Sequence, residues 1–174
     1  AEEELTIPFV ASGGMADARS LVAALAMGAQ GMNMGTRFIA TKEAPVHPNV
    51  KQALLKATEL DTRLVMRALR NTERVLTNKN VEKLIEIEKE KGKSLKIEDI
   101  MDQVAGVYPK VMQDGEMDAG AWSCGMMVGL INDIPTCKEL IDRIMADAEF
   151  IIRKRLTGFL DGTFTAATPR KKVA

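Results

Sequence analysis

The feature that most constrains the fold is a short apolar segment, residues 5–11, that ends at a Ser-Gly-Gly sequence. A continuous apolar run closed by glycine is typical of a strand that is buried on both faces of a parallel sheet. Asp17 can then cap a helix that runs to about Ala29, and residues 31–35 follow as a second short strand. Strand, glycine loop, helix and strand in this order predict one βαβ unit with a right-handed crossover.

The rest of the chain is predicted to be mainly helical. Apolar residues recur at helical spacing from residue 49, from 80 to the glycine at 92, and again from 97 to 104. Residues 62–76 fit either a strand or a helix, and extended structure is favoured there.

Two further helices are predicted near the carboxyl end. The first covers about residues 119–132 and contains three glycines, whose cost in helix propensity indicates close packing or a ligand. The second opens with a Thr-Cys-Lys-Glu capping box at 136–139. Its apolar stripe is expected to face the core and consists of Ile141, Ile144, Met145, Ala148, Ile152 and Leu156.

Charge and composition exclude several classes of protein. The chain has 24 Lys+Arg and 24 Asp+Glu, so its formal net charge is zero, and a run of consecutive basic residues lies at 170–172. Binding to nucleic acid needs a clustered excess of positive charge, so a nucleic-acid partner is not expected. No apolar stretch of about 18 residues predicts a membrane span. The acidic start at 2–4 is unlike a secretory signal, and Cys124 and Cys137 lack metal-ligand spacing. A cytoplasmic protein with reduced thiols and no metal site is therefore favoured.

Two glycine-containing turns are the candidate binding residues. Ser12-Gly13-Gly14 follows the first predicted strand, and Met34-Gly35-Thr36 follows the second. Both turns lie at the carboxyl ends of parallel strands, where α/β folds bind their ligands. Main-chain N–H groups and a threonine hydroxyl can donate to phosphate oxygens. The pair predicts one shared phosphate site, as in (β/α)8 barrels after the seventh and eighth strands.

Longer stretches of the sequence resemble a known family. Residues 8–17 (PFVASGGMAD) and 23–38 (AALAMGAQGMNMGTRF) are similar to the last two barrel units of the nitronate monooxygenase family, formerly called 2-nitropropane dioxygenases. The flavin-dependent enoyl-acyl carrier protein reductases share this pattern. Residues 121–131 and 133–136 also resemble the C-terminal region of nitronate monooxygenases, so the resemblance spans almost the whole chain.

The resemblance implies an α/β fold, the C-terminal part of an FMN-binding TIM (β/α)8 barrel. The last two βα units would occupy residues 1–45, and a mainly helical region would occupy 46–174. The implied FMN-phosphate site has two walls, Ser12, Gly13 and Gly14 on one side and Asn33, Met34, Gly35 and Thr36 on the other. Asn33 stands where the family often has Gln, which keeps the amide but shortens its reach.

The implied activity is the FMN-dependent oxidative denitrification of alkyl nitronates, with O2 as co-substrate. The alternative within the same flavin barrel family is NAD(P)H-dependent reduction of an enoyl thioester. The family's catalytic His lies on an earlier strand that this chain lacks, and His47 beside Pro48 fits a surface turn. No catalytic residue is therefore expected here, and we expect this fragment alone to be inactive.

A different class of function is a truncated, non-catalytic chain that folds only with a partner. The partner would be the missing N-terminal barrel portion or, in a homo-oligomer, another copy. This hypothesis predicts exposed edges on a two-stranded sheet, which favour association.

Overall fold

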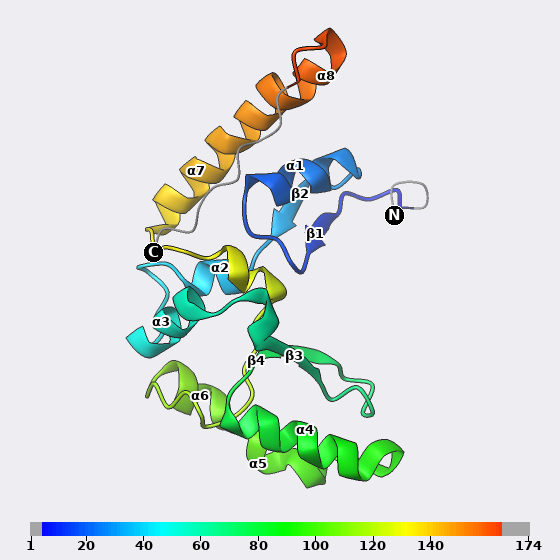
Figure 1. Cartoon of the computed structure of the whole chain (residues 1–174), viewed down its shortest axis with the longest axis vertical. Coiled ribbons are helices and arrows are strands. Elements are labelled where there is room, and N and C mark those ends of the chain that lie inside the picture. The colour runs from blue at the N-terminus through cyan, green and yellow to red at the C-terminus, as the bar shows by residue number, and fades with distance from the viewer. Residues whose placement is uncertain (1–4, 165–174) are drawn as a thin grey trace. The chain divides into compact units, whose positions relative to one another are not determined.

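The computed structural model describes residues 5–164, which form two compact units (Figure 1). The sheet unit consists of residues up to 43 together with those from 132 onward, and the hairpin unit consists of residues 44–131. This grouping differs from the predicted division into 1–45 and 46–174, because the last helices pack against the first. The basic run at 170–172 and the acidic start at 2–4 lie outside the described residues.

The sheet unit contains the predicted βαβ arrangement. Strands β1 (Val10–Ser12) and β2 (Gly31–Asn33) pair in parallel and are joined by helix α1 (Ala18–Ala26). The side chain of Asp17 caps α1 by accepting the N–H groups of Arg19 and Ser20. The helix ends earlier than predicted, in a Schellman arrangement where the Ala29 N–H donates to the Ala24 carbonyl at 3.0 Å.

The prediction that the first strand is buried on both faces is wrong for this chain. Ile7 is 67% exposed and Val10 is 60% exposed. Within residues 5–164, β1 has β2 as its sheet neighbour, and the two strands form a two-stranded sheet. An apolar run of this kind needs covering layers on both faces, and the described part of the chain supplies only some of them.

The remaining helices of the sheet unit are α2 (Thr36–Ile39), α7 (Cys137–Phe150) and α8 (Thr157–Asp161), with a π-helical segment, Ile151–Leu156, between the last two. Figure 1 shows α7 running beside α1, and their contact is a small core of Ala18, Val22 and Ala148. The predicted capping box is confirmed, because the Thr136 hydroxyl accepts the Glu139 N–H at 3.1 Å and the Glu139 carboxylate accepts the Thr136 N–H at 2.7 Å.

The predicted apolar stripe of this last helix is only partly correct. Ile144 and Ala148 are buried and, with Leu140, form the packed face of α7. Four other members of the stripe are between 42% and 57% exposed: Ile141, Met145, Ile152 and Leu156. The apolar residues of this helix therefore cover more of its surface than the sheet unit buries.

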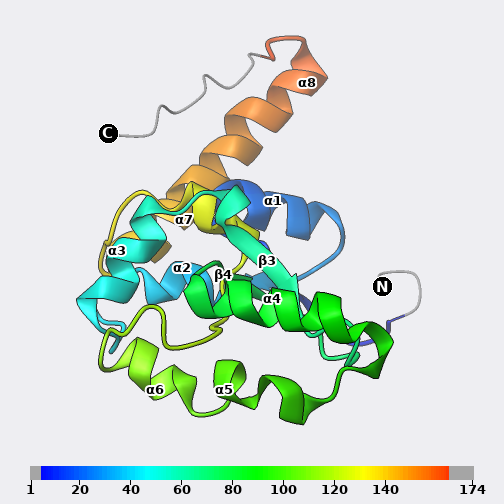
Figure 2. The ribbon, with the colours of Figure 1, turned by 60° about the horizontal axis from the view of Figure 1, so that its bottom comes forward.

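The hairpin unit is built around an antiparallel hairpin. Strands β3 (Thr62–Val65) and β4 (Glu73–Leu76) pair with Thr62 opposite Leu76, which confirms the extended structure favoured for 62–76. Figures 1 and 2 show helix α4 (Lys79–Lys91) beside this hairpin, and they share one core. The other helices of the unit are α3 (Pro48–Lys56), α5 (Met101–Val104) and α6 (Val107–Met112).

The predicted helix at 119–132 is wrong. The segment is mostly without regular secondary structure, with a 3₁₀ helix at Met126–Leu130 and an isolated bridge between Ser123 and Val75 of β4. Two of its three glycines mark close packing, as predicted. A Cβ on Gly120 would lie 2.6 Å from the Gln103 carbonyl oxygen, and a Cβ on Gly129 would lie 2.9 Å from the Glu59 backbone nitrogen. Glycine spacing therefore predicted close backbone approach but not the conformation.

Within residues 5–164, no helix combines the length and the apolar character that crossing a membrane requires. No group of three or more His, Cys, Asp or Glu side chains in the same range is arranged to hold a metal ion.

Candidate functional site

The two predicted phosphate loops lie at the same end of the β1–β2 pair. The parallel register places Ser12 opposite Asn33, so both chains leave the sheet at one edge. The Asn33 side-chain amide donates a hydrogen bond to the Ser12 hydroxyl at 3.1 Å. This bond joins the last residues of the two strands, and it shows that the shorter amide reaches across the pair. The structure thus brings the two predicted walls together.

Gly13 and Gly14 are both in the left-handed backbone region, with φ angles of +87° and +71°. A Cβ built on either residue would meet nothing within 4 Å, and the same holds for Gly35 in the second loop. The turn at 13–14 therefore requires glycine for its backbone conformation, and not because neighbouring atoms crowd it. Both loops face open space, which is what the approach of a phosphate to the main chain requires.

The N-terminus of α1, which follows the first loop, already holds an anion. Burial alone would raise the pKa of Asp17, but hydrogen bonds from Arg19 and Ser20 lower it below the ordinary value. The Ser20 hydroxyl accepts the Ala16 N–H at 3.2 Å. An ionised carboxylate at this helix end opposes a second anion there. A phosphate would therefore be held by the glycine loops and not by the end of α1.

The second loop leads into α2 through Gly35. This residue occupies the capping position without a side-chain hydrogen bond, and its carbonyl accepts the N–H groups of Phe38 at 2.9 Å and Ile39 at 3.2 Å. Met34 and Thr36, on either side of it, are half-buried. The Thr36 hydroxyl and the first amides of α2 are the donors that this loop could offer to a phosphate.

An ion-pair network that the sequence analysis missed anchors α2 within the sheet unit. Arg37 is only 3% exposed, and its guanidinium donates to the Asp133 carboxylate at 2.6 Å and to the Asp133 carbonyl at 3.1 Å. Arg143 donates to the same carboxylate at 2.5 Å. The Arg143 hydrogen bond lowers the pKa of Asp133, while burial lowers the pKa of Arg37 although Asp133 opposes this.

This network positions the loop at 33–36, because Arg37 directly follows Thr36. Its partners lie 96 residues apart in the sequence, so no local pattern revealed them. The available signal was an arginine directly before the apolar residues 38–40, since a buried arginine needs a carboxylate partner.

His47 lies in the hairpin unit and caps α3. Its Nδ1 accepts the Asn49 N–H at 3.1 Å, and its own backbone N–H donates to the Met112 carbonyl at 2.6 Å. The ring is half-buried beside Gly115. This capping bond gives His47 a structural role at the start of α3.

In the segment at 121–131, three side chains are buried or hydrogen-bonded, those of Trp122, Ser123 and Cys124. Trp122 is fully buried, whereas Tyr108 on α6 is 44% exposed and donates its hydroxyl hydrogen to the Ser123 hydroxyl at 2.7 Å. Ser123 also contacts the carboxylate of Glu73. Burial raises the pKa of the Cys124 thiol to about 12, so this cysteine is not a nucleophile at neutral pH.

A βαβ unit with glycine loops at the carboxyl ends of adjacent parallel strands belongs to the α/β proteins that bind ligands at that edge. A family model described as nitronate monooxygenase matches residues 1–147. The chain therefore belongs to the nitronate monooxygenase family.

The curated relatives carry two kinds of name. The chain is similar to a (3aS,4S,5R,7aS)-5-hydroxy-7a-methyl-1-oxo-octahydro-1H-indene-4-carboxyl-CoA dehydrogenase of Rhodococcus jostii, with 32% identity over 180 residues, 84% of this chain and 51% of the relative. A probable nitronate monooxygenase of Bacillus subtilis is 45% identical over 64 residues, 37% of this chain and 18% of the relative. The chain spans about half the length of the first of these relatives.

The structure is similar to part of a solved enzyme structure. FabK from Thermotoga maritima superposes with a TM-score of 0.83 and 32% identity, over 91% of this chain and 49% of that chain. A nitroalkane oxidase from Streptomyces ansochromogenes has a TM-score of 0.64 at 23% identity, over 84% of this chain and 41% of that chain, and it supports the fold alone. The chain thus has the fold of about half of FabK.

Proposed function

We propose that this chain supplies the FMN-phosphate side of a flavin-dependent oxidoreductase built on a TIM barrel. The observation that carries the proposal is the register that places Ser12 opposite Asn33 and brings both glycine loops to one edge of the sheet. The open space around Gly13, Gly14 and Gly35 fits a phosphate held by main-chain N–H groups.

The roles proposed for the individual residues follow from their positions. Gly13 and Gly14 would offer main-chain donors on one side, and Gly35 with the Thr36 hydroxyl would offer donors on the other. The bond between Asn33 and Ser12 would hold the two walls together. FMN, when bound, supplies the redox chemistry, and the protein supplies binding and orientation.

An alkyl nitronate is the proposed substrate, with O2 as co-substrate. Membership of the nitronate monooxygenase family supports this substrate class. A second candidate is an acyl thioester, with NAD(P)H as reductant. The support for this candidate is the Rhodococcus relative, which is named a carboxyl-CoA dehydrogenase and matches 84% of this chain.

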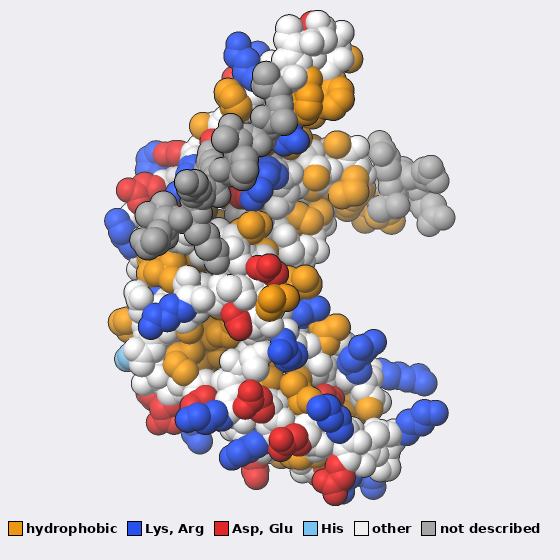
Figure 3. Space-filling view, viewed as in Figure 1, with side chains coloured by type: hydrophobic (Ala, Val, Ile, Leu, Met, Phe, Trp, Pro, Cys, Tyr) orange, Lys and Arg blue, Asp and Glu red, His pale blue; other side chains and the backbone are white. Residues whose placement is uncertain are grey.

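The proposed partner is the remainder of the barrel, with a homo-oligomer as the alternative. Apolar side chains around β1 and α1 are exposed within the sheet unit, among them Ile7, Val10 and Met27 at 67%, 60% and 63% (Figure 3). Further strands beside β1 and β2 would cover these residues and pair the open edges of the sheet.

The phosphate site is tested by comparing FMN with riboflavin, which lacks the phosphate. We expect FMN to bind at least about tenfold more tightly, because a charge-assisted phosphate contact contributes on the order of 1.5–3 kcal/mol. Flavin fluorescence measures both affinities, and the ³¹P NMR shift of FMN reports on the phosphate. The titration is run on the chain alone and on the chain expressed with the remaining half of the FabK barrel.

Gly13→Ala and Gly31→Ala form a matched pair for this titration. At Gly13 an alanine must adopt a positive φ at a cost of about 1–2 kcal/mol, whereas at Gly31 its Cβ meets only Val10 Cγ1 at 3.8 Å. Gly13→Ala should remove the preference for FMN, and Gly31→Ala should keep it. Equal affinity of the unmodified protein for FMN and riboflavin would refute the phosphate site.

The substrate is tested separately with the flavin-loaded protein under anaerobic conditions. Bleaching of the flavin absorbance by propyl-1-nitronate, but not by NADPH, supports the nitronate assignment. Bleaching by NADPH followed by reoxidation with an enoyl thioester supports the second candidate.

A further inference from the structure

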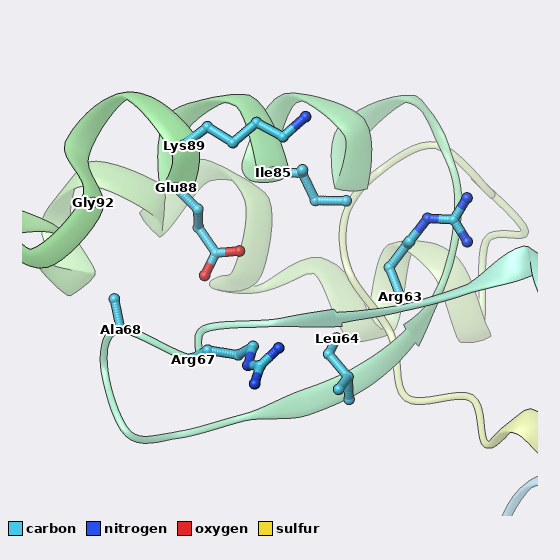
Figure 4. A pocket seen from close by; sticks show the side chains of 8 residues that line it. All are labelled: Arg63, Leu64, Arg67, Ala68, Ile85, Glu88, Lys89 and Gly92. Carbon is cyan, nitrogen blue, oxygen red and sulfur yellow. The ribbon is translucent and has the colours of Figure 1, made fainter.

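Arginine side chains gather in both units, but in different surroundings. On the hairpin, Arg63 and Arg67 line an open depression beside α4, and the Glu88 carboxylate points into it (Figure 4). In the sheet unit the side chain of Arg37 is buried, and it directly follows the second phosphate loop. A buried charge must be paired and hydrogen-bonded, so the groups around Arg37 determine where it and the adjoining loop lie.

The carboxylate of Asp133 is shared by two arginines. Arg37 donates to its Oδ1 at 2.6 Å, and Arg143 of α7 donates to Oδ2 at 2.5 Å and to Oδ1 at 3.2 Å. Arg37 also donates to the backbone carbonyl of Asp133 at 3.1 Å, so it holds both the side chain and the main chain of this residue. Contacts at two points fix orientation as well as distance. Arg143 therefore orients the carboxylate that orients Arg37.

The chain that follows the second phosphate loop is attached to the segment at 133–137 at three points. The contact of Arg37 with Asp133 is the first. Two further hydrogen bonds, each at 2.9 Å, join the same segments: the Lys42 N–H to the Pro135 carbonyl and the Cys137 N–H to the Glu43 carboxylate. Of the three, the contact made by Arg37 lies nearest to Thr36 in the sequence, so it has the most direct influence on the loop.

Helix α2 depends on these contacts for its direction. It is a single turn, and Gly35 at its start makes no side-chain capping bond. One turn is not stable in isolation, so its orientation is determined by the groups to which it is attached. The Thr36 hydroxyl and the first amides of α2, which are the donors of this loop, move with the helix. Donors of a binding site must be held within about 0.5 Å of their productive positions, so a small rotation of α2 would weaken a phosphate contact.

We propose that Asp133 and Arg143 are positioning residues of the phosphate site, acting through Arg37 on the direction of α2. The proposal rests on the proposed function, because it concerns the same phosphate site. It assigns a part in cofactor binding to Asp133, which lies 96 positions from Arg37 in the sequence. Loss of either positioning residue should weaken the binding of FMN but not that of riboflavin, which lacks the phosphate.

A purely electrostatic role of the cluster predicts the opposite result. Two guanidinium groups share the Asp133 carboxylate, and Arg143 is also attracted by Glu139 and Asp147. If the cluster acted only by attracting an anion, removal of the Asp133 charge would leave more positive charge beside the loop and would tighten FMN binding. If Asp133 positions α2, the same change weakens FMN binding. The sign of the effect therefore distinguishes the two roles.

The test measures the affinities of the whole chain for FMN and for riboflavin by flavin fluorescence. Asp133→Asn keeps the size of the side chain and one acceptor, and it should lower the ratio of FMN to riboflavin affinity about fivefold, the effect of one hydrogen bond. Arg143→Gln should lower the ratio about threefold, and Arg143→Lys, which keeps the charge, should restore part of it. Arg153→Gln is the matched control, because Arg153 pairs with Glu149 at 2.6 Å, and it should leave the ratio unchanged.

A second readout does not need the flavin. In the chain without flavin, Asp133→Asn should shift the amide NMR signals of residues 35–39 and leave those of Gly13 and Gly14 unchanged. The Arg143 side chain is 42% exposed, so its variants test the proposal even if Asp133→Asn fails to fold, which circular dichroism would show.

The outcomes separate this proposal from the proposed function. An unchanged affinity ratio in variants that fold, or tighter binding of FMN, would overturn the positioning role and leave the phosphate site intact. Equal binding of FMN and riboflavin by the unmodified chain would instead contradict the phosphate site, and the positioning role with it.

Discussion

The hairpin unit buries its large apolar side chains, whereas the sheet unit leaves many of its own exposed. In the hairpin unit the fully buried residues include Leu84, Ile100 and Trp122. Among the described residues of the sheet unit, those with no exposed surface are alanines, Ala24 and Ala40. The difference follows from strand pairing, because a hairpin with a helix across it closes a core, whereas two parallel strands need neighbours on both edges and faces.

The largest effect is expected from a cavity in the hairpin core. Leu84→Ala removes a fully buried side chain and should lower the free energy of unfolding by about 2–5 kcal/mol. Trp122, the one tryptophan of the chain, lies in the same unit, so its fluorescence during urea denaturation measures the change. Leu160→Ala, at a position 89% exposed, is the control and should leave the midpoint unchanged. A loss below about 1 kcal/mol for Leu84→Ala would show that this core is loosely packed.

The sheet unit has a small core, and the buried ion pair between Arg37 and Asp133 is expected to contribute much of its stability. Asp133→Ala would leave the buried guanidinium of Arg37 without a carboxylate and should cost about 3 kcal/mol. Hydrogen exchange of α2 and α7 measures this loss. Asp142→Ala breaks the exposed pair with Lys138 and should change exchange little. If Asp133→Ala lowers the free energy of unfolding measured by Trp122 fluorescence as much as it lowers the free energy of opening measured by hydrogen exchange in α2, the two units are not stabilised independently.

The smallest effect is expected in the reactivity of the two cysteine thiols, one in each unit. Cys124 in the hairpin unit is 1% exposed, and Cys137 in the sheet unit is half-buried. At pH 8 a thiol reagent should label Cys137 first and Cys124 only on unfolding. The folded pKa of Cys124 is raised from 9.0 to about 12, so its contribution to stability is present below pH 9 and is lost as the pH rises toward 12. Cys124→Ala should remove that alkaline loss, and rapid labelling of both thiols at pH 8 would contradict the burial.

Local signals predicted the parts of the fold that local interactions determine. The cap at Asp17 and the box formed by Thr136 and Glu139 are contacts within one helical turn, and both are present. The sequence placed the two predicted phosphate loops at the ends of the two strands, and the parallel register brings those strand ends to one edge of the sheet. The helix predicted at 119–132 was wrong, since glycines have low helix propensity and two of the three, Gly120 and Gly129, pack closely against the backbone of Gln103 and Glu59.

Contacts between distant segments escaped prediction. Arg37 meets Asp133 from 96 positions away, and Ser123 bridges to β4 across about 50 residues. The burial expected for the first strand depends on neighbours that residues 5–164 do not provide, so its apolar character could not by itself determine exposure. The depression beside α4 is likewise formed by two elements, the hairpin and the helix.

The π-helical segment, Ile151–Leu156, has a consequence for comparing this chain with others. A π turn holds one more residue than an α turn, and at the end of this segment the Thr157 hydroxyl donates to the Ile152 carbonyl at 3.1 Å. Each residue of an α-helix advances the side chains by about 100°. A homologue whose helix is α throughout should therefore align with a one-residue gap between 151 and 156. Without that gap, every position of α8 would be matched to a side chain on a different face.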